Sequence, residues 1–108
     1  MARVLSRQAQ TAVKLIGTEI AQARRERRWS VEGLAQRAGV SPVTVRAVEH
    51  GSPTVAVGTV FELAVLTGVP LFVSEAAELR RQLAVSRDRL ALLPKRVHEA
   101  AREISDAF

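Results

Sequence analysis

Residues 30–51 contain the pattern that most constrains the fold of this chain: two short helical segments separated by a single glycine. Ser30 stands where a helix N-cap accepts hydrogen bonds from the first amides. Apolar side chains then follow at helical spacing, at Leu34, Ala35 and Ala38. Gly39 can take the left-handed conformation that ends a helix, and Val40 supplies an apolar side chain between the segments. The sequence therefore predicts two helices joined by a tight turn.

The second segment begins with two residues that favour a helix start. Ser41 is a good N-cap, and Pro42 in the first turn loses no hydrogen bond because the amide there has no acceptor within the helix. Val45 and Val48 are predicted to face inward. The opposite stripe follows the 3.6-residue period and contains Val43, Arg46, Ala47 and His50, with Pro42 and Thr44 at its leading end. Such an exposed stripe is typical of helix-turn-helix proteins that read the DNA major groove.

The chemistry of this stripe suits duplex DNA. Arg46 can donate two hydrogen bonds to the acceptors of a guanine. The apolar members can contact only methyl groups, such as that of thymine. Hydroxyl groups near the helix starts suit phosphate contacts, which position a protein without specifying sequence; they belong to Ser30, Ser41 and Thr44. Helix pairs with a glycine turn also occur in all-helical proteins of other kinds. Periodicity alone therefore leaves open whether this helix pair binds DNA or is only part of the fold.

A wider set of residues resembles a known family. The Xre family of bacterial and phage repressors is similar over about Val13 to Phe72, through the runs RRERRWS, LAQRAGVSPVTVRAVEHG and TVFELAVLTGVPL. The resemblance implies an all-α fold: a five-helix Xre/lambda-repressor-like helix-turn-helix domain, here with an added C-terminal helix and tail. It also implies a homodimer on pseudo-palindromic operator DNA.

The resemblance further implies an ion pair. In the family, an arginine late in the first helix pairs with a glutamate near the end of the recognition helix, which corresponds to Arg24 and Glu49 here. We interpret this pair as structural, since breaking a partly buried ion pair from one side is costly. Polar residues commonly lead the family's recognition helix, whereas this chain has Pro42 and Val43 there. The family's base preferences are therefore not transferable.

The charge balance favours an acidic partner. The 108 residues carry a formal net charge of +5, with an isoelectric point of about 11.2, which strengthens long-range attraction to phosphates. Four arginines are predicted to end the first helix: Arg24, Arg25, Arg27 and Arg28. The favourable interaction of these arginines with the negative end of the helix dipole is sufficient to explain why they stand there. We also expect Arg25 and Arg28 to contact the DNA backbone.

Other classes of protein are disfavoured by what the sequence lacks. There is no cysteine, and His50 and His98 are far apart, so we expect no metal ion. No glycine-rich phosphate loop or paired acid and base is present, so we expect neither an enzyme nor a cofactor. Aromatic residues, at 4%, are few for stacking unpaired bases, which favours duplex DNA over single strands. The sequence has no leader pattern and no membrane-spanning window, so we expect a cytoplasmic protein without a membrane partner.

The chain is expected to form two parts. Residues 1–73 make the helix-turn-helix domain with a short N-terminal arm, and residues 74–108 make a C-terminal helix and charged tail. A first helix to about Arg28 has an inward stripe at Val13, Ile16, Ile20 and Ala23. After a loop over residues 51–58, Thr59 caps a further helix that Gly68 ends; its apolar residues are Phe61, Leu63, Ala64 and Leu66. The core is expected to be closed by Val69, Leu71 and Phe72.

Residues 74–93 predict a helix that is capped by Ser74 and ended by Pro94. If Ser86 is accepted as an interruption, leucines form one seam at three- and four-residue spacing: Leu79, Leu83, Leu90 and Leu93. We interpret this seam as a dimer contact. The alternative is that the same leucines dock on their own domain.

The last residues carry a second resemblance. The segment RLALLPKRV, followed by an acidic end with a terminal phenylalanine, is similar to the C-terminus of HipB-type antitoxins, which are Xre proteins encoded beside HipA-like kinase toxins. It implies that Phe108 anchors, and Asp106 orients, a HipA-like toxin protein. Without such a partner, the tail is expected to be solvated or partly helical.

Two functional hypotheses follow. The leading one is a sequence-specific repressor that binds double-stranded operator DNA as a dimer near its own gene and doubles as the antitoxin of a HipA-like toxin. The alternative is a protein-interaction module in which specific DNA binding is weak or absent.

Overall fold

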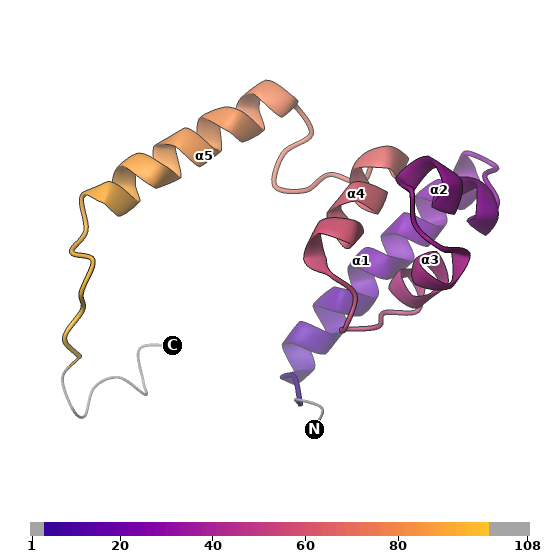
Figure 1. The fold of residues 1–108 in the computed structure, drawn as a ribbon, viewed down its shortest axis with the longest axis horizontal. Helices are drawn as coiled ribbons and strands as arrows, with labels where there is room; N and C mark the ends of the chain where they lie inside the picture. Colours follow the sequence, from indigo (N-terminus) through magenta and orange to yellow (C-terminus); the bar gives the residue numbers. More distant parts are fainter. Residues whose placement is uncertain (1–3, 100–108) are drawn as a thin grey trace. The chain divides into compact units, whose positions relative to one another are not determined.

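The computed structural model describes residues 4–99, which are helical apart from loops and one isolated bridge between Leu71 and Val73. The helices are α1 (Arg7–Glu26), α2 (Val31–Ala38), α3 (Pro42–Glu49), α4 (Val57–Thr67) and α5 (Ala76–Ala91) (Figure 1). Contacts divide the chain into two units, Met1–Ser74 with α1 to α4 and Glu75–Phe108 with α5. The predicted all-α helix-turn-helix class is confirmed.

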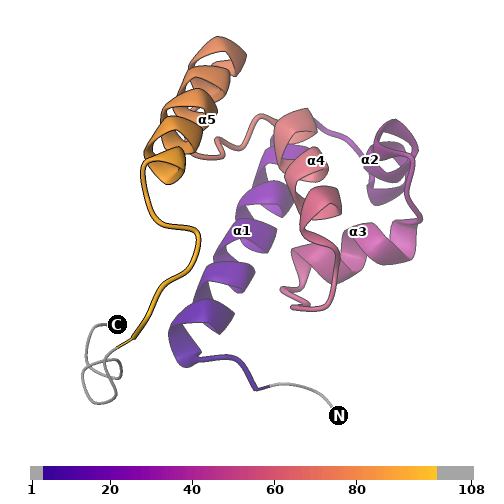
Figure 2. The ribbon, with the colours of Figure 1, turned by 60° about the vertical axis from the view of Figure 1, so that its left-hand side comes forward.

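The core of the first unit lies where its four helices meet. α3 and α4 each pack against both α1 and α2 (Figures 1 and 2). The buried apolar side chains are Ile20, Leu34, Ala35, Val45, Val48, Leu63, Ala64 and Val69. Their removal from water is the main favourable term in folding. Ile20 confirms the inward stripe of α1, with Ile16 and Ala23 partly buried against the core.

Gly17 permits the close crossing of α1 and α3. It is buried, and a Cβ atom at this position would collide with the backbone carbonyl oxygen of Val48 on α3. A backbone atom cannot rotate away as a side chain can, so the two helices approach this closely only at a glycine. The sequence reasoning missed this role, because a glycine inside a helix registers there only as a weak helix former.

The first helix ends before the predicted boundary at Arg28. α1 ends at Glu26, and the amide of Trp29 donates to the carbonyl oxygen of Arg24 across a turn in which Arg28 has a φ of 59°. This left-handed conformation is uncommon for a residue with a Cβ atom, and glycine usually occupies it at helix ends. Arg28 therefore belongs to the turn between α1 and α2.

The predicted start of α4 at Thr59 is wrong. The amide of Thr59 donates to the carbonyl oxygen of Ala56, which is the N-cap, although its side chain offers no capping bond. α4 therefore begins at Val57, and Thr59 lies inside it. Gly68 ends the helix as predicted, with a φ of 82°.

Both predicted boundaries of α5 are also wrong. The amide of Leu79 donates to Glu75, so Glu75 and not Ser74 is the N-cap. α5 ends at Ala91 and leaves Leu93 outside the helix. The residue before a proline disfavours the helical conformation, and Pro94 follows Leu93 directly.

Phe72 does not close the core. It is 81% exposed, whereas Val69 is buried and Leu71 packs against the core as predicted. The amide of Val73 donates to the carbonyl oxygen of Leu71, and this tight turn gives Phe72 a φ of 65°. The ring of Phe72 therefore lies outside the core, where it meets the ring of Phe61 edge to face.

Candidate nucleic-acid interface

The two short helices α2 and α3 begin as the capping residues predicted. The Ser30 hydroxyl oxygen accepts from the amide of Gly33 at 2.9 Å, and that of Ser41 accepts from the amide of Thr44 at 3.2 Å. Gly39 between the helices has a φ of 71°. The Ser30 hydroxyl oxygen accepts from the backbone, so its own hydrogen stays free for another acceptor, whereas the hydroxyl groups of Ser41 and Thr44 form a hydrogen bond with each other at 3.0 Å.

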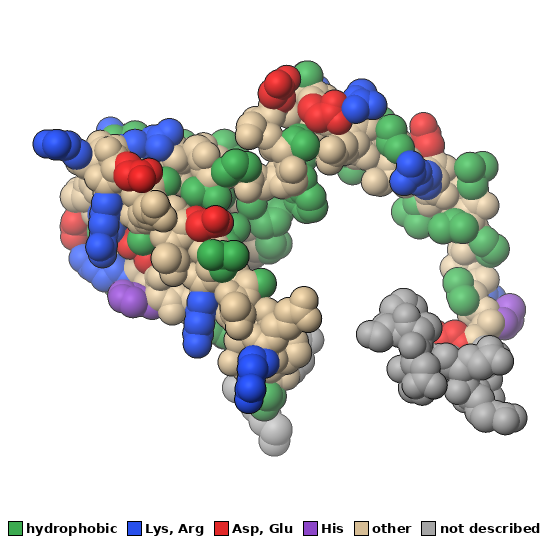
Figure 3. Space-filling view, turned by 180° about the vertical axis from the view of Figure 1, so that it is seen from behind, with side chains coloured by type: hydrophobic (Ala, Val, Ile, Leu, Met, Phe, Trp, Pro, Cys, Tyr) green, Lys and Arg blue, Asp and Glu red, His purple; other side chains and the backbone are tan. Residues whose placement is uncertain are grey.

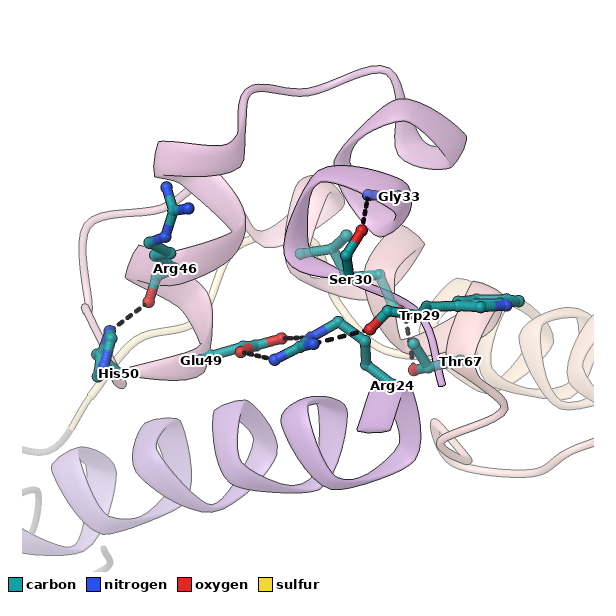
Figure 4. Close-up of polar contacts among 9 residues, drawn as sticks. Arg24, Trp29, Ser30, Gly33, Arg46, Glu49, His50 and Thr67 are labelled. Carbon is teal, nitrogen blue, oxygen red and sulfur yellow. Dashed lines mark hydrogen bonds and ion pairs between the residues drawn. The ribbon is translucent and has the colours of Figure 1, made fainter. Parts of the chain in front are cut away.

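The outward stripe of α3 faces solvent along part of its length. Val43 is 72% exposed and His50 is exposed, while Val45 and Val48 on the other side are buried. The remaining predicted members are half-buried: Pro42, Thr44 and Ala47. Arg46 lies on the same side of α3 as His50, and Glu49 points to the opposite side (Figure 4). The structure therefore brings the predicted base-reading side chains together on one surface.

Arg46, the predicted guanine reader, is held by an acid that the sequence reasoning missed. Its Nη2 atom lies 2.9 Å from the Glu32 Oε2 atom, with side chains 50% and 64% exposed. Glu32 belongs to the first turn of α2 and Arg46 to α3, so the ion pair bridges the two helices. A separation of 14 residues across a turn has no periodicity that could have indicated the pair.

His50 is oriented by the backbone of the same helix. Its Nδ1 atom lies 2.8 Å from the carbonyl oxygen of Arg46 (Figure 4). A carbonyl oxygen can only accept, so Nδ1 carries the hydrogen and donates. In the neutral ring, Nε2 is then an acceptor that is left for another group.

Arg24 fixes the opposite side of α3. Its Nε and Nη2 atoms donate to the two carboxylate oxygens of Glu49 at 2.7 and 3.0 Å, and Nη1 donates to the carbonyl oxygen of Trp29 at 2.8 Å (Figure 4). Both charged side chains are less than one-tenth exposed. The hydrogen bonds to Glu49 raise the pKa of Arg24 above its ordinary value, although burial opposes this. The structure thus pairs the two residues that the family resemblance implied, and ties the end of α1 to the end of α3.

The four arginines predicted near the end of the first helix differ in whether they have a partner within the protein. Arg24 is used in the ion pair, and the Arg27 guanidinium lies 5.6 Å from the Trp29 ring centroid. Arg37 of α2 stacks more closely on the same ring, at 4.1 Å. Arg25 and Arg28 are exposed, and among residues 4–99 neither forms an ion pair. They remain the members of the cluster that are free to meet phosphates.

An exposed apolar surface on α4 was also missed. Val57, Phe61 and Val65 lie at four-residue spacing, so they share one side of the helix, and Phe72 packs on Phe61. A hollow of about 380 Å³ lies beside them, and α1 supplies another wall through Val13 and Ile16. Hydrophobic side chains gather on one part of the visible surface and Lys and Arg side chains on another (Figure 3). The sequence pattern names Phe61 only as an apolar residue of this helix, and the hydrophobic pattern of α4 has no clear polar side that would indicate which residues are exposed.

The predicted dimer and partner residues lie in the second unit. α5 has no buried residue, and its leucines Leu79, Leu83 and Leu90 are exposed, as is Leu93 beyond its end. The ion pair between Arg81 and Glu78 lies within α5. Asp106 and Phe108 fall outside the described residues.

The described part of the chain contains no cluster of side chains suited to hold a metal ion. Its helices are too short or too polar to cross a membrane.

The arrangement of α2 and α3 agrees with the comparison to known proteins. A family model described as a helix-turn-helix domain matches residues 15–79, more than half of the chain. The match runs from within α1 to the beginning of α5 and contains the whole α2–α3 pair. No curated protein and no solved structure matches the chain significantly.

Proposed function

The chain belongs to the family of helix-turn-helix domains, and on this premise we propose that it is a transcriptional repressor that binds operator DNA sequence-specifically as a dimer. The observation that carries the proposal is the division of α3. Arg24 and the core hold one side, and Arg46 with Val43 faces solvent on the other. A rigidly held helix with one exposed side can enter a major groove without rearrangement.

The residues of the exposed surface have separate roles in this proposal. Arg46 donates two hydrogen bonds to a guanine, and Val43 contacts a thymine methyl group. The hydroxyl groups of Ser30 and Ser41, with the exposed Arg25 and Arg28, bind phosphates and set the register. Occupied promoter DNA is then closed to transcription, and the protein's own promoter is the first site to examine.

Replacement of Arg46 tests the recognition surface. Binding is measured by fluorescence anisotropy on the duplex that wild type selects from a random pool. Arg46→Ala is expected to lower affinity by about 1–3 kcal/mol, roughly 5- to 150-fold, and to relax the preference at one base pair. Arg80→Ala is the matched control, because it removes the same charge from α5. An unchanged site preference in Arg46→Ala contradicts the assignment of α3.

Salt dependence tests the phosphate contacts separately. Each neutralised phosphate releases counterions, so affinity is expected to fall steeply between about 50 and 200 mM salt. Arg25→Ala or Arg28→Ala should make that fall shallower and leave the preferred site unchanged. An affinity that does not depend on salt counts against DNA as the target.

A homodimer through α5 completes the repressor. Most of the stability of a helix in a protein comes from packing of its apolar face, and α5 exposes Leu79, Leu83 and Leu90. Packing of two copies along these leucines supplies the burial that α5 lacks. Leu83→Asp should give a monomer by analytical ultracentrifugation, whereas Gln82→Asp, one position away, should not. A dimer that survives Leu83→Asp places the interface elsewhere.

A second candidate function is a module that binds another protein. The exposed surface of Val57, Phe61, Val65 and Phe72 favours it, since contiguous apolar surface often marks an interaction site. The antitoxin role, which the leading hypothesis combines with repression, also needs a protein partner, with Asp106 and Phe108 as the proposed contacts to a HipA-like toxin. Affinity purification of the full chain beside a chain truncated after Pro94 tests it. A kinase-like protein that is lost on truncation supports the antitoxin, and recovery of the protein alone contradicts it.

A further inference from the structure

The ion pair between Glu32 and Arg46 has a geometry that bears on sequence discrimination. One carboxylate oxygen of Glu32 binds Nη2 of Arg46 at 2.9 Å. The Nε and Nη1 atoms of Arg46 make no hydrogen bond to any residue in the described range. Half of the Arg46 side chain is exposed. The guanidinium is therefore held at one nitrogen and keeps further donors for a ligand.

An unrestrained arginine on such a surface would serve two kinds of ligand. It can donate two bonds to a guanine, and it can equally pair with a phosphate, which every DNA sequence offers. The second interaction strengthens binding to all sequences and lowers discrimination between them. A carboxylate beside the guanidinium opposes it, because the carboxylate and the phosphate carry the same charge. It does not oppose the neutral acceptors of a guanine to the same degree.

We propose that Glu32 is a specificity-determining residue, which holds Arg46 for base recognition and repels phosphate from it. The inference rests on the proposed function, since it concerns how Arg46 reads DNA. Glu32 gives up affinity for DNA in general and increases the ratio between affinity for the operator and affinity for other duplexes. It acts through Arg46 and needs no contact with a base of its own.

A purely structural role predicts a different result. Glu32 lies in the first turn of α2, where an acidic side chain interacts favourably with the helix dipole. If that were its whole role, removal of its charge would lower thermal stability slightly. The ratio between operator and non-operator affinity would then change no more than it does on removal of any other carboxylate.

The test compares Glu32→Gln with Glu62→Gln, which removes the same charge from an exposed position on α4. Affinities are measured at one salt concentration for the selected duplex and for a scrambled duplex of equal length. Glu32→Gln should raise affinity for the scrambled duplex more than for the selected one. The discrimination ratio should fall by about two- to fivefold, the range of exposed ion pairs. Glu62→Gln should change both affinities by the same factor.

The decisive experiment makes Glu32→Gln in a protein that already carries Arg46→Ala. In it, Glu32→Gln should no longer change the discrimination ratio, because the residue through which Glu32 acts is absent. An unchanged or increased ratio in Glu32→Gln, or an equal fall in the two backgrounds, overturns the inference and leaves the proposed function intact. A wild-type protein that selects no sequence from the random pool overturns the proposed function and this inference with it.

Discussion

The two sides of α3 differ in burial and in the partners of their charged side chains. On one side Val45 and Val48 are buried and Glu49 is bound by Arg24. On the other, Val43 is exposed and Arg46 is restrained by an exposed ion pair with Glu32. The first side determines where the helix lies, and the second is free to meet a ligand. Mutations on the first side should therefore affect stability, and mutations on the second should affect binding.

The largest effect is expected at the crossing of α1 and α3. Gly17→Ala forces a Cβ atom against the carbonyl oxygen of Val48, so the helices must separate. We expect a loss of unfolding free energy of about 3 kcal/mol, the upper range for overpacking, by urea denaturation. Gly58→Ala is the matched control, because a Cβ atom there meets open space. Equal effects of the two substitutions would show that Gly17 does not set the helix spacing.

The ion pair between Arg24 and Glu49 should have an effect of similar size. Arg24→Met leaves the nearly buried carboxylate of Glu49 without its partner, which we expect to cost on the order of 3 kcal/mol of stability. The ordinary pKa of an arginine already lies far above the neutral range and Glu49 raises the pKa of Arg24 further, so the wild-type guanidinium stays charged there. The double variant Arg24→Met with Glu49→Leu should recover most of the lost stability, as measured by urea denaturation. A double variant as unstable as the sum of its single changes contradicts a coupled pair.

Two valines on opposite sides of α3 give the sharpest comparison, because the same substitution can be made at both. Val45 is fully buried and Val43 is 72% exposed, two residues apart on the same helix. Val45→Ala should cost about 2 kcal/mol through lost burial and a small cavity. Val43→Ala should change stability by less than about 0.5 kcal/mol, by the same denaturation experiment. If both substitutions destabilise equally, α3 has no free side.

Much of the helix-turn-helix unit could be predicted from residues whose effect is local. Ser30, Gly39 and Ser41 each act on a backbone group within three or four residues, so their roles follow from spacing alone. The predicted helix starts were wrong where the first backbone hydrogen bonds form at a residue other than the nearest good capping residue. Thr59 and Ser74 are good caps by composition, yet the helices begin at Ala56 and Glu75.

Other errors came from the geometry of a turn and from a contact between two helices. Phe72 is apolar and was assigned to the core, but a turn over Leu71 and Val73 directs it outward. Glu32 reaches Arg46 only because the turn brings the two helices together. Neither relation has a periodic signal in the chain, since the first depends on the conformation of a turn and the second on how α2 and α3 are placed.

The sequence by itself determined the all-α class, the helix pair over residues 30–51 and the outward stripe that contains Arg46. These features depend on capping, glycine conformation and helical period, which are properties of neighbouring residues. Only the tertiary structure decided which arginines remain free for a ligand. Arg24 is bound to Glu49, Arg46 is held by Glu32, and the guanidinium of Arg37 stacks on Trp29. The physical reason is that charged side chains are long and pair with groups that lie close to them in the folded protein. Local sequence patterns do not encode these distances.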